Sequence, residues 1–155
     1  MKIFLLTHTR ELDRATNTGS LAMENANGLV ERIVWERTHP SKELIQLIES
    51  NEALLLYAQG EHSTAATENF ENIIVIDATW QEARKMFNKS PYLQQAPRLT
   101  LALKKNSAYK LRRNQPVGGL CTIECIIEIL KIKGQQEIAL ELSQKFVAFN
   151  NQEKR

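Results

Sequence analysis

Asp77 combines a residue type that can move protons or hold ligands with a position where active sites are common. It follows the segment 72–76, a near-continuous aliphatic run, which predicts a buried strand of a parallel sheet. It precedes the segment 79–82, Thr-Trp-Gln-Glu, which matches the capping box of a helix N-terminus. Ligands of open parallel sheets bind beyond the carboxyl ends of the strands, near free helix N-termini. Asp77 is therefore a candidate general base or ligand anchor, and the alternative is an ordinary turn aspartate that helps to cap the helix.

Two further side chains near predicted strand and helix ends can contribute to the same chemistry. Trp80 lies in the first turn of the predicted helix, where it is either a core or lid residue or a flat surface for an adenine or uracil ring. His8 follows the predicted first strand and can act as a base or bind phosphate, although a histidine at a strand end is more often structural. The sequence near His8 contains no serine or cysteine that would indicate nucleophilic catalysis with this histidine as the base.

A basic stretch lies at residues 98–113, which contain no acidic side chain. Its basic residues are Arg98, Lys104, Lys105, Lys110, Arg112 and Arg113. The formal net charge of +2 by itself argues neither for nor against a polyanionic partner. The stretch is either a solvated face or a surface that contacts phosphates.

The two cysteines do not indicate a disulfide or a metal centre. Cys121 and Cys125 lie four residues apart, on one face of a predicted helix, and no histidine flanks them. We expect two small buried apolar residues and no metal. The chain also carries no phosphate-loop or dinucleotide-binding fingerprint.

The elements that must position these residues alternate between strands and helices. Strands are predicted at 2–7, 29–35, 54–57, 72–76 and 99–103, with Val30, Ile33 and Val34 available to a core. Helices are predicted after the possible caps at 16–20, from Pro40 and Ser41, over 80–89 until Pro91, around Ile123 to Leu130, and around Ile138 to Phe149. Polar connections are predicted at 59–67 and 104–119. This alternation predicts an α/β fold with a mostly parallel sheet and helices on both faces.

The length of 155 residues fits a single domain over 1–155, with 150–155 as a frayed polar tail. The longest apolar runs are strand-sized, so no membrane span is predicted. The first residues leave little room for a signal peptide, and we expect a cytoplasmic protein.

Several segments, in the same order, resemble one known family. Residues 76–86, Ile-Asp-Ala-Thr-Trp-Gln-Glu-Ala-Arg-Lys-Met, resemble the signature of the DTW-domain proteins. Leu6-Thr7-His8 with Glu11 and Asn17-Thr18, then Gly60-Glu61, Ser90-Pro91, 109–112 and 120–124 resemble further blocks of that family. The resemblance extends from Leu5 to Leu130. Because of this resemblance, we favour a functional role for Asp77 over that of an ordinary turn aspartate.

The resemblance implies a tRNA-uridine aminocarboxypropyltransferase that uses S-adenosylmethionine as group donor. It also implies a fold similar to the SPOUT methyltransferases, with a trefoil knot. The implied mechanism is a displacement in which the uridine N3 attacks the γ-carbon of the methionine part and methylthioadenosine leaves. Asp77 is the expected catalytic residue, either as the base for the N3 proton or by holding the amino group of the donor.

The resemblance and the expected loop positions give two groups of site residues. The expected donor pocket consists of Tyr57, Gly60, Thr79, Trp80, Leu120, Thr122 and Glu124. The residues expected to contact tRNA phosphates are His8, Arg10, Arg84, Lys104, Lys105, Lys110, Arg112 and Arg113. Oligomeric state is left open, with a monomer favoured.

The chain departs from the family pattern in two respects. Many members carry an N-terminal cysteine-rich segment that looks metal-binding, whereas this chain begins at its first predicted strand, so zinc is not expected. Cys121 stands where the family usually has serine, and Cys125 where alanine is common, which leaves Thr122 as the nearby hydroxyl.

The same sequence features are also compatible with three other functions. An RNA methyltransferase could use the same donor and release S-adenosylhomocysteine. A non-catalytic RNA-binding module would explain the basic stretch without chemistry. A third alternative is an α/β domain that binds another nucleotide.

Overall fold

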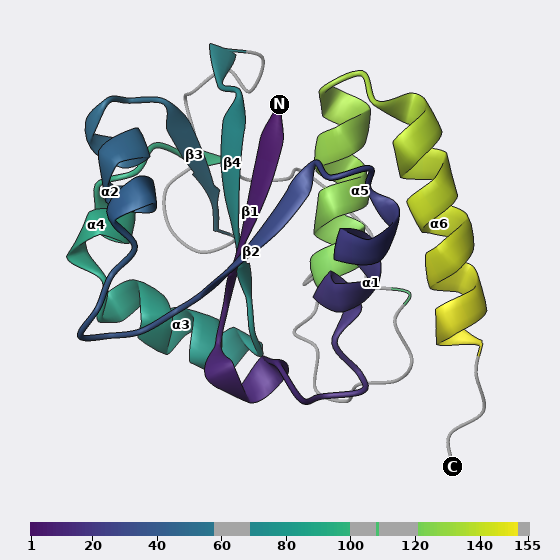
Figure 1. Ribbon diagram of the computed structural model, residues 1–155, viewed down its shortest axis with the longest axis horizontal. Coiled ribbons are helices and arrows are strands. Elements are labelled where there is room, and N and C mark those ends of the chain that lie inside the picture. Colours follow the sequence, from purple (N-terminus) through teal and green to yellow (C-terminus); the bar gives the residue numbers. More distant parts are fainter. Residues whose placement is uncertain (58–68, 100–107, 109–120, 152–155) are drawn as a thin grey trace.

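The computed structural model describes residues 1–57, 69–99, 108 and 121–151. Within this part of the chain, five parallel strands form one sheet in the order β2-β1-β4-β3-β5 (Figure 1). The strands are β1 (Lys2–Thr7), β2 (Val30–Val34), β3 (Ala53–Leu56), β4 (Asn72–Asp77) and β5 (Arg98–Leu99). The helices are η1 (Thr9–Glu11), a 3₁₀ turn, and α1 (Thr18–Asn25), α2 (Lys42–Glu49), α3 (Trp80–Asn88), α4 (Pro91–Gln94), α5 (Thr122–Ile132) and α6 (Gln136–Asn150). The predicted α/β class is confirmed.

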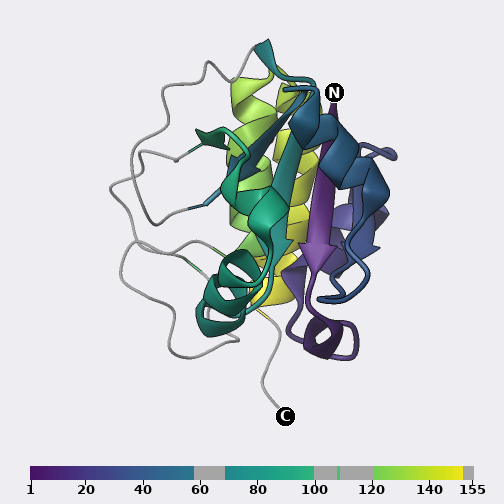
Figure 2. The same cartoon turned by 90° about the vertical axis from the view of Figure 1, so that its left-hand side faces the viewer.

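Helices cover both faces of the sheet, as predicted. Side chains of a strand point alternately to its two faces. Ile3 and Leu5 of β1 belong to a cluster with α1, α5 and α6, whereas Phe4 and Leu6 belong to a second cluster with α2, α3 and α4. The two groups of helices lie on opposite sides of the strands in Figures 1 and 2. Two covered faces explain why the central strands read as continuous aliphatic runs.

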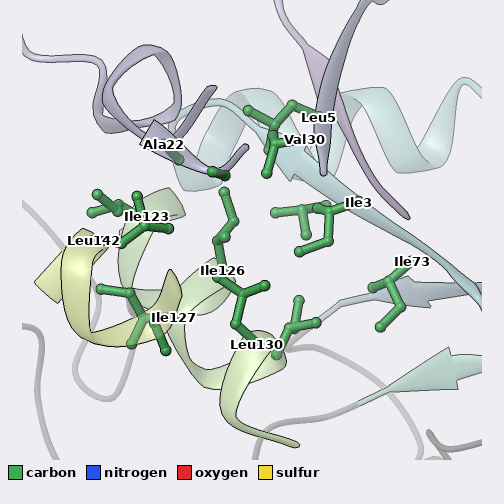
Figure 3. Close-up of a cluster of buried hydrophobic side chains, with 14 of the residues drawn as sticks. Ile3, Leu5, Ala22, Val30, Ile73, Ile123, Ile126, Ile127, Leu130 and Leu142 are labelled. Atoms are coloured by element: carbon green, nitrogen blue, oxygen red, sulfur yellow. The ribbon is translucent and has the colours of Figure 1, made fainter. Parts of the chain in front are cut away.

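The larger cluster is built around α5. Figure 3 shows Ile126 of α5 between Ile123 and Leu130, with the side chains of β1 opposite. These residues follow the helical spacing that predicted the apolar face of this helix. Ile126 has no exposed surface, so α5 is held to the sheet by apolar burial.

Three helices begin at caps that the sequence indicates. The side chains of Asn17, Ser41 and Thr79 accept hydrogen bonds from backbone N–H groups of α1, α2 and α3. Thr79 and Glu82 form the complete capping box. Gly28 follows α1 with a φ of +79°, a conformation that glycine adopts without strain.

Several predicted details differ from the structure. Pro91 does not only end α3; it is also the first residue of α4, because proline suits the first turn of a helix. Val34, a predicted core candidate, is 39% exposed because it lies at the end of the edge strand β2. Of the predicted strand 99–103, only Leu99 lies within the described residues, where it belongs to β5.

The C-terminal helix extends further than expected. α6 ends at Asn150, the first residue of the predicted polar tail, and the side-chain Nδ2 of Asn150 donates to the carbonyl oxygen of Ala108 at 2.7 Å. Residues 152–155 lie outside the described residues. The chain path between β5 and α5, on which a knot depends, also lies outside them apart from Ala108. None of the helices described here has the length and apolar character to cross a bilayer.

The packing of α5 gives a first prediction. Ile126→Ala should lower the free energy of unfolding by about 2–5 kcal/mol, because it removes buried methyl groups and leaves a cavity. Ile132→Ala, a change on the same helix at a residue 50% exposed, should change it by less than about 0.5 kcal/mol. Urea unfolding followed by circular dichroism measures both values. Equal losses in the two variants would contradict this description of the core.

Candidate functional site

The Asp77 carboxylate is the centre of a buried polar cluster at the carboxyl end of β4. The residue is 1% exposed. Its Oδ1 accepts hydrogen bonds from Thr122 Oγ1 at 2.8 Å and Asn17 Nδ2 at 3.0 Å. Its Oδ2 accepts from Thr7 Oγ1 and Asn17 Nδ2, both at 3.1 Å, and from Arg32 Nη2 at 3.4 Å. Four donors from different parts of the chain therefore hold one carboxylate.

Strand register explains why these side chains meet. Thr7 is the direct neighbour of Asp77 across the β1·β4 pair, and Arg32 is the neighbour of Leu5 across the β1·β2 pair. In-register residues of parallel strands share a face, and alternate residues of one strand do too. Thr7, Arg32 and Asp77 therefore lie on the face that carries α1, α5 and α6, where they form a polar layer at the end of the apolar core.

The N-terminus of α1 lies directly against this carboxylate. Asn17 caps α1 through its Oδ1, which accepts from the backbone N–H of Ser20 at 2.8 Å. Gly19 follows in the first turn, and a Cβ added there would lie 2.7 Å from Asp77 Oδ2. No side chain fits at that distance without a shift of the helix or of the carboxylate. The absence of a side chain at position 19 thus allows the close approach of α1.

A second group of charges links η1 to α3. Glu11 has no exposed surface and accepts from Asn17 Nδ2 at 2.9 Å and from the guanidinium of Arg14. Arg14 also donates to both carboxylate oxygens of Glu82, at 3.1 and 3.0 Å. Glu82 in turn belongs to the capping box with Thr79. The segment that follows β1 is therefore held by Arg14 to α3, the helix that follows Asp77.

The pKa of Glu82 records this environment. Burial alone would raise the pKa, but hydrogen bonds from Arg14 and from the backbone and hydroxyl of Thr79 outweigh it and lower the pKa to about 2. Arg14 shows the matching effect, since its hydrogen bond to Glu82 raises its pKa. The pair is therefore charged in the folded protein at neutral pH.

The N-terminus of α5 completes the cluster. Thr122 is the first residue of α5, and its hydroxyl donates to Asp77. The backbone N–H of Ile123 donates to Thr18 Oγ1 at 3.1 Å, which joins the first turns of α5 and α1. Glu124 accepts from the backbone N–H groups of Cys121 at 3.0 Å and Ala108 at 2.9 Å. Glu124 thus caps α5 and also binds the backbone of Ala108, which precedes α5 in the chain.

Cys121 matches the expectation of a small buried residue, whereas Cys125 is only half-buried. Cys121 is buried and Cys125 packs against the larger apolar cluster, and neither forms a disulfide. Burial raises the pKa of both thiols, to about 12 for Cys125. Within the described residues, no three His, Cys, Asp or Glu side chains are grouped to hold a metal ion.

The other predicted donor-site residues that the structure describes lie at the carboxyl edge of the sheet, but on its two opposite faces. Thr122 and Glu124 begin α5 on one face, whereas Tyr57 stacks on Phe87 of α3 on the other face, with ring centroids 4.2 Å apart. Trp80 is 41% exposed at the start of α3. The structure therefore does not bring Tyr57 beside Thr122. Gly60 and Leu120 lie outside the described residues.

Of the predicted phosphate contacts, three lie within the described residues. His8 caps η1, its Nδ1 accepts from the backbone N–H of Arg10, and its ring stacks on Trp35 at a centroid distance of 6.0 Å. Arg10 and Arg84 are exposed. The remaining five, Lys104, Lys105, Lys110, Arg112 and Arg113, lie outside the described residues.

Sequence reasoning missed Arg32 and Arg14, and it gave no role to Gly19. Arg32 carries a detectable signal, because it stands two residues after buried Val30 in a predicted strand and so shares its core-facing side. Arg14 and Gly19 show no comparable signal, because their partners are far away in the sequence.

Residues 1–154 match the family model described as the DTW domain. The match covers essentially the whole chain, so the chain belongs to the DTW-domain family. This family is associated with tRNA modification, which implies a transferase that acts on tRNA with a group donor derived from S-adenosylmethionine. No solved structure matches the chain.

The lowered pKa of Glu82 predicts a pH-dependent stability. A carboxyl whose pKa falls from 4.5 to about 2 on folding stabilises the folded state above pH 4.5, and this contribution is lost as the pH falls through 2. Glu82→Gln should therefore lower the free energy of unfolding at pH 7 by about 1–2 kcal/mol, less than the pKa change alone implies because water screens this partly exposed carboxylate, and by progressively less below pH 4.5. Urea unfolding at several pH values tests this.

Glu141→Gln, at an exposed carboxylate in the middle of α6, is the control. It should change the free energy of unfolding by less than about 0.5 kcal/mol at any of these pH values. A Glu82→Gln effect that is the same at low and neutral pH would contradict the charged pair with Arg14.

Proposed function

Because this chain belongs to the DTW-domain family, we propose that it transfers the 3-amino-3-carboxypropyl group of S-adenosylmethionine to N3 of a tRNA uridine. The observation that carries the proposal is the position of the family's aspartate. Asp77 lies at the carboxyl end of the sheet and is bonded to the first turns of two helices, α1 and α5. Ligands of parallel α/β sheets bind at this edge.

The groups at this edge suit the methionine part of the donor. Its ammonium group needs carboxylates or carbonyl oxygens, and its carboxylate is favoured by the amides and dipole of a helix N-terminus. The first turns of α3 and α5 both lie at the edge, where their dipoles favour the donor's carboxylate. Asp77 and Glu82 add negative charge beside these turns, while their oxygens accept hydrogen bonds from the chain's own side chains. Bound there, the donor supplies an electrophilic γ-carbon next to a positively charged sulfur.

The proposed reaction is a single displacement. The bond from uridine N3 to the γ-carbon forms, the bond from that carbon to sulfur breaks, and the sulfur keeps the electron pair as neutral methylthioadenosine. The N3 proton passes to water or to a base. The sulfonium has three carbons open to attack, so the protein selects the product by aligning one of them with N3.

We assign Asp77 the role of a positioning residue in this reaction. As the base it would have to reach the N3 proton within hydrogen-bond distance. Both of its oxygens instead accept hydrogen bonds from Thr7, Asn17, Arg32 and Thr122, and only 1% of the residue is exposed. The carboxylate therefore acts by fixing the first turns of α1 and α5 relative to the sheet.

Exposed groups around this edge are proposed to hold the tRNA. Trp80 offers a flat surface to an unstacked base, as aromatic side chains do in RNA recognition. The exposed Arg10 and Arg84 would contact phosphates, as would the less exposed His8. We propose the same for the basic side chains of 104–113, which lie outside the described residues. Binding should then weaken steeply with added salt.

Product analysis tests the transfer itself. The protein incubated with tRNA and S-adenosylmethionine should release methylthioadenosine in proportion to aminocarboxypropyl-uridine, both measured by mass spectrometry. Reactions without tRNA are the control and should release neither. Accumulation of S-adenosylhomocysteine would instead identify a methyltransferase, and failure to consume the donor would favour a binding module.

Replacing Asp77 tests its assigned role. Asp77→Asn should lower kcat about 100-fold, because one amide cannot accept from all the donors that the carboxylate now serves and the first turns of α1 and α5 shift. Asp13→Asn, at the chain's one other aspartate and exposed in the same segment, should retain wild-type kcat.

The pH dependence of the Asp77→Asn variant separates positioning from base catalysis. A protein that has lost only its base recovers at alkaline pH, where more uridine is already deprotonated. A protein that has lost positioning stays slower than the wild-type protein by the same factor between about pH 7 and about pH 9. A loss relative to the wild-type protein that disappears toward pH 9 would show that Asp77 is the base.

A further inference from the structure

Arg32 reaches across β1 into the cluster around Asp77. Its Nε donates to Thr7 Oγ1 at 3.1 Å, and its Nη2 donates to Asn17 Oδ1 at 2.9 Å and to Ser20 Oγ at 3.1 Å. The same Nη2 lies 3.4 Å from Asp77 Oδ2. The side chain is 16% exposed, so its charge is largely shielded from water. One guanidinium thus contacts β1, α1 and β4 at once.

We propose that Arg32 is a positioning residue that acts through Asn17 and Asp77, an inference that rests on the proposed transfer reaction. Nothing in the motif pattern assigns it a role. Its effect depends on the orientation of the Asn17 side-chain amide, which the guanidinium contacts directly.

Asn17 can serve Asp77 only if its amide group points the right way. Its Oδ1 accepts from Ser20 and Arg32, while its Nδ2 donates to Glu11 and to both oxygens of Asp77. A flipped amide would turn its NH₂ group toward the guanidinium, which has only donors, and its oxygen toward two carboxylates, which have only acceptors. Arg32 therefore acts together with the Ser20 N–H and the two carboxylates to hold Asn17 in this orientation.

The geometry requires arginine and not merely a positive charge. The planar guanidinium directs Nε to Thr7 and Nη2 to α1, whereas a lysine ammonium is a single point on a flexible stem. Lysine can supply the charge near Asp77 but cannot make both contacts in these fixed directions. The two substitutions Arg32→Lys and Arg32→Met should therefore differ in degree.

A double-mutant cycle tests the proposal. Arg32→Met should lower kcat about 100-fold in the otherwise unchanged protein but less than about 3-fold in the Asp77→Asn background, because its effect passes through that carboxylate. Arg32→Lys should lower kcat about 10-fold, with the KM for tRNA changed by less than about 3-fold. Glu31→Gln, at the adjacent residue whose partner is Lys2, should leave kcat unchanged.

Two results would overturn the proposal. Equal losses in both backgrounds would show that Arg32 acts independently of Asp77. An increased KM for tRNA with unchanged kcat would show a phosphate contact. If Arg32→Met does not fold, the same double-mutant cycle is measured with Arg32→Lys in the wild-type and Asp77→Asn backgrounds.

A second measurement separates this proposal from the proposed function. The side-chain amide signals of Asn17 in a ¹⁵N-correlated NMR spectrum should shift in Arg32→Lys and stay in place in Glu31→Gln. Unchanged signals in Arg32→Lys would overturn the role of Arg32 even in an active protein. If the wild-type protein released no methylthioadenosine, the proposed transfer reaction would be wrong. The NMR measurement would still test whether Arg32 positions the Asn17 side chain.

Discussion

A buried carboxylate is stable only where hydrogen-bond donors replace the water that it has lost. For Asp77 those donors are Thr7 from β1, Asn17 from the start of α1, Arg32 from β2 and Thr122 from the start of α5. The requirement acts in both directions, because each donor is also buried or half-buried and needs an acceptor. No buried side-chain nitrogen or oxygen in the described part of the chain lacks a partner. The interaction therefore fixes the carboxyl edge of the sheet as a unit, and the proposed chemistry depends on that unit.

The apolar core and this polar cluster are two ends of one layer. The face of the sheet that carries Ile3 and Leu5 in β1 continues to Thr7, and the face that carries Ile73 and Val75 in β4 continues to Asp77. Burial of the aliphatic residues fixes the register, and the register then places the polar pair side by side. Apolar packing, which is not directional, thus determines the geometry of groups whose interactions are directional.

Local signals predicted much of this structure, while contacts between distant segments were not predictable. The capping box of Thr79 and Glu82 depends on residues three apart, so its pattern is visible in the sequence and the structure confirms it. Arg32 and Asp77 are separated by 45 residues, and only the pairing of β2 with β1 and β1 with β4 brings them together. The strand order itself follows from tertiary packing that no local pattern encodes. The family's motif marked Asp77 as important but did not indicate that four side chains enclose it.

The close approach of α1 to Asp77 means that position 19 does not tolerate a side chain. Any side chain at position 19 would place its Cβ 2.7 Å from Asp77 Oδ2, so even alanine, the smallest replacement and the better helix former, has no room. Substitutions of glycine by alanine within helices ordinarily stabilise proteins, so a routine attempt to strengthen α1 would here push the helix away from the sheet. Engineers who seek a more robust version of this protein should therefore modify the remote surface of α6 and leave this turn untouched.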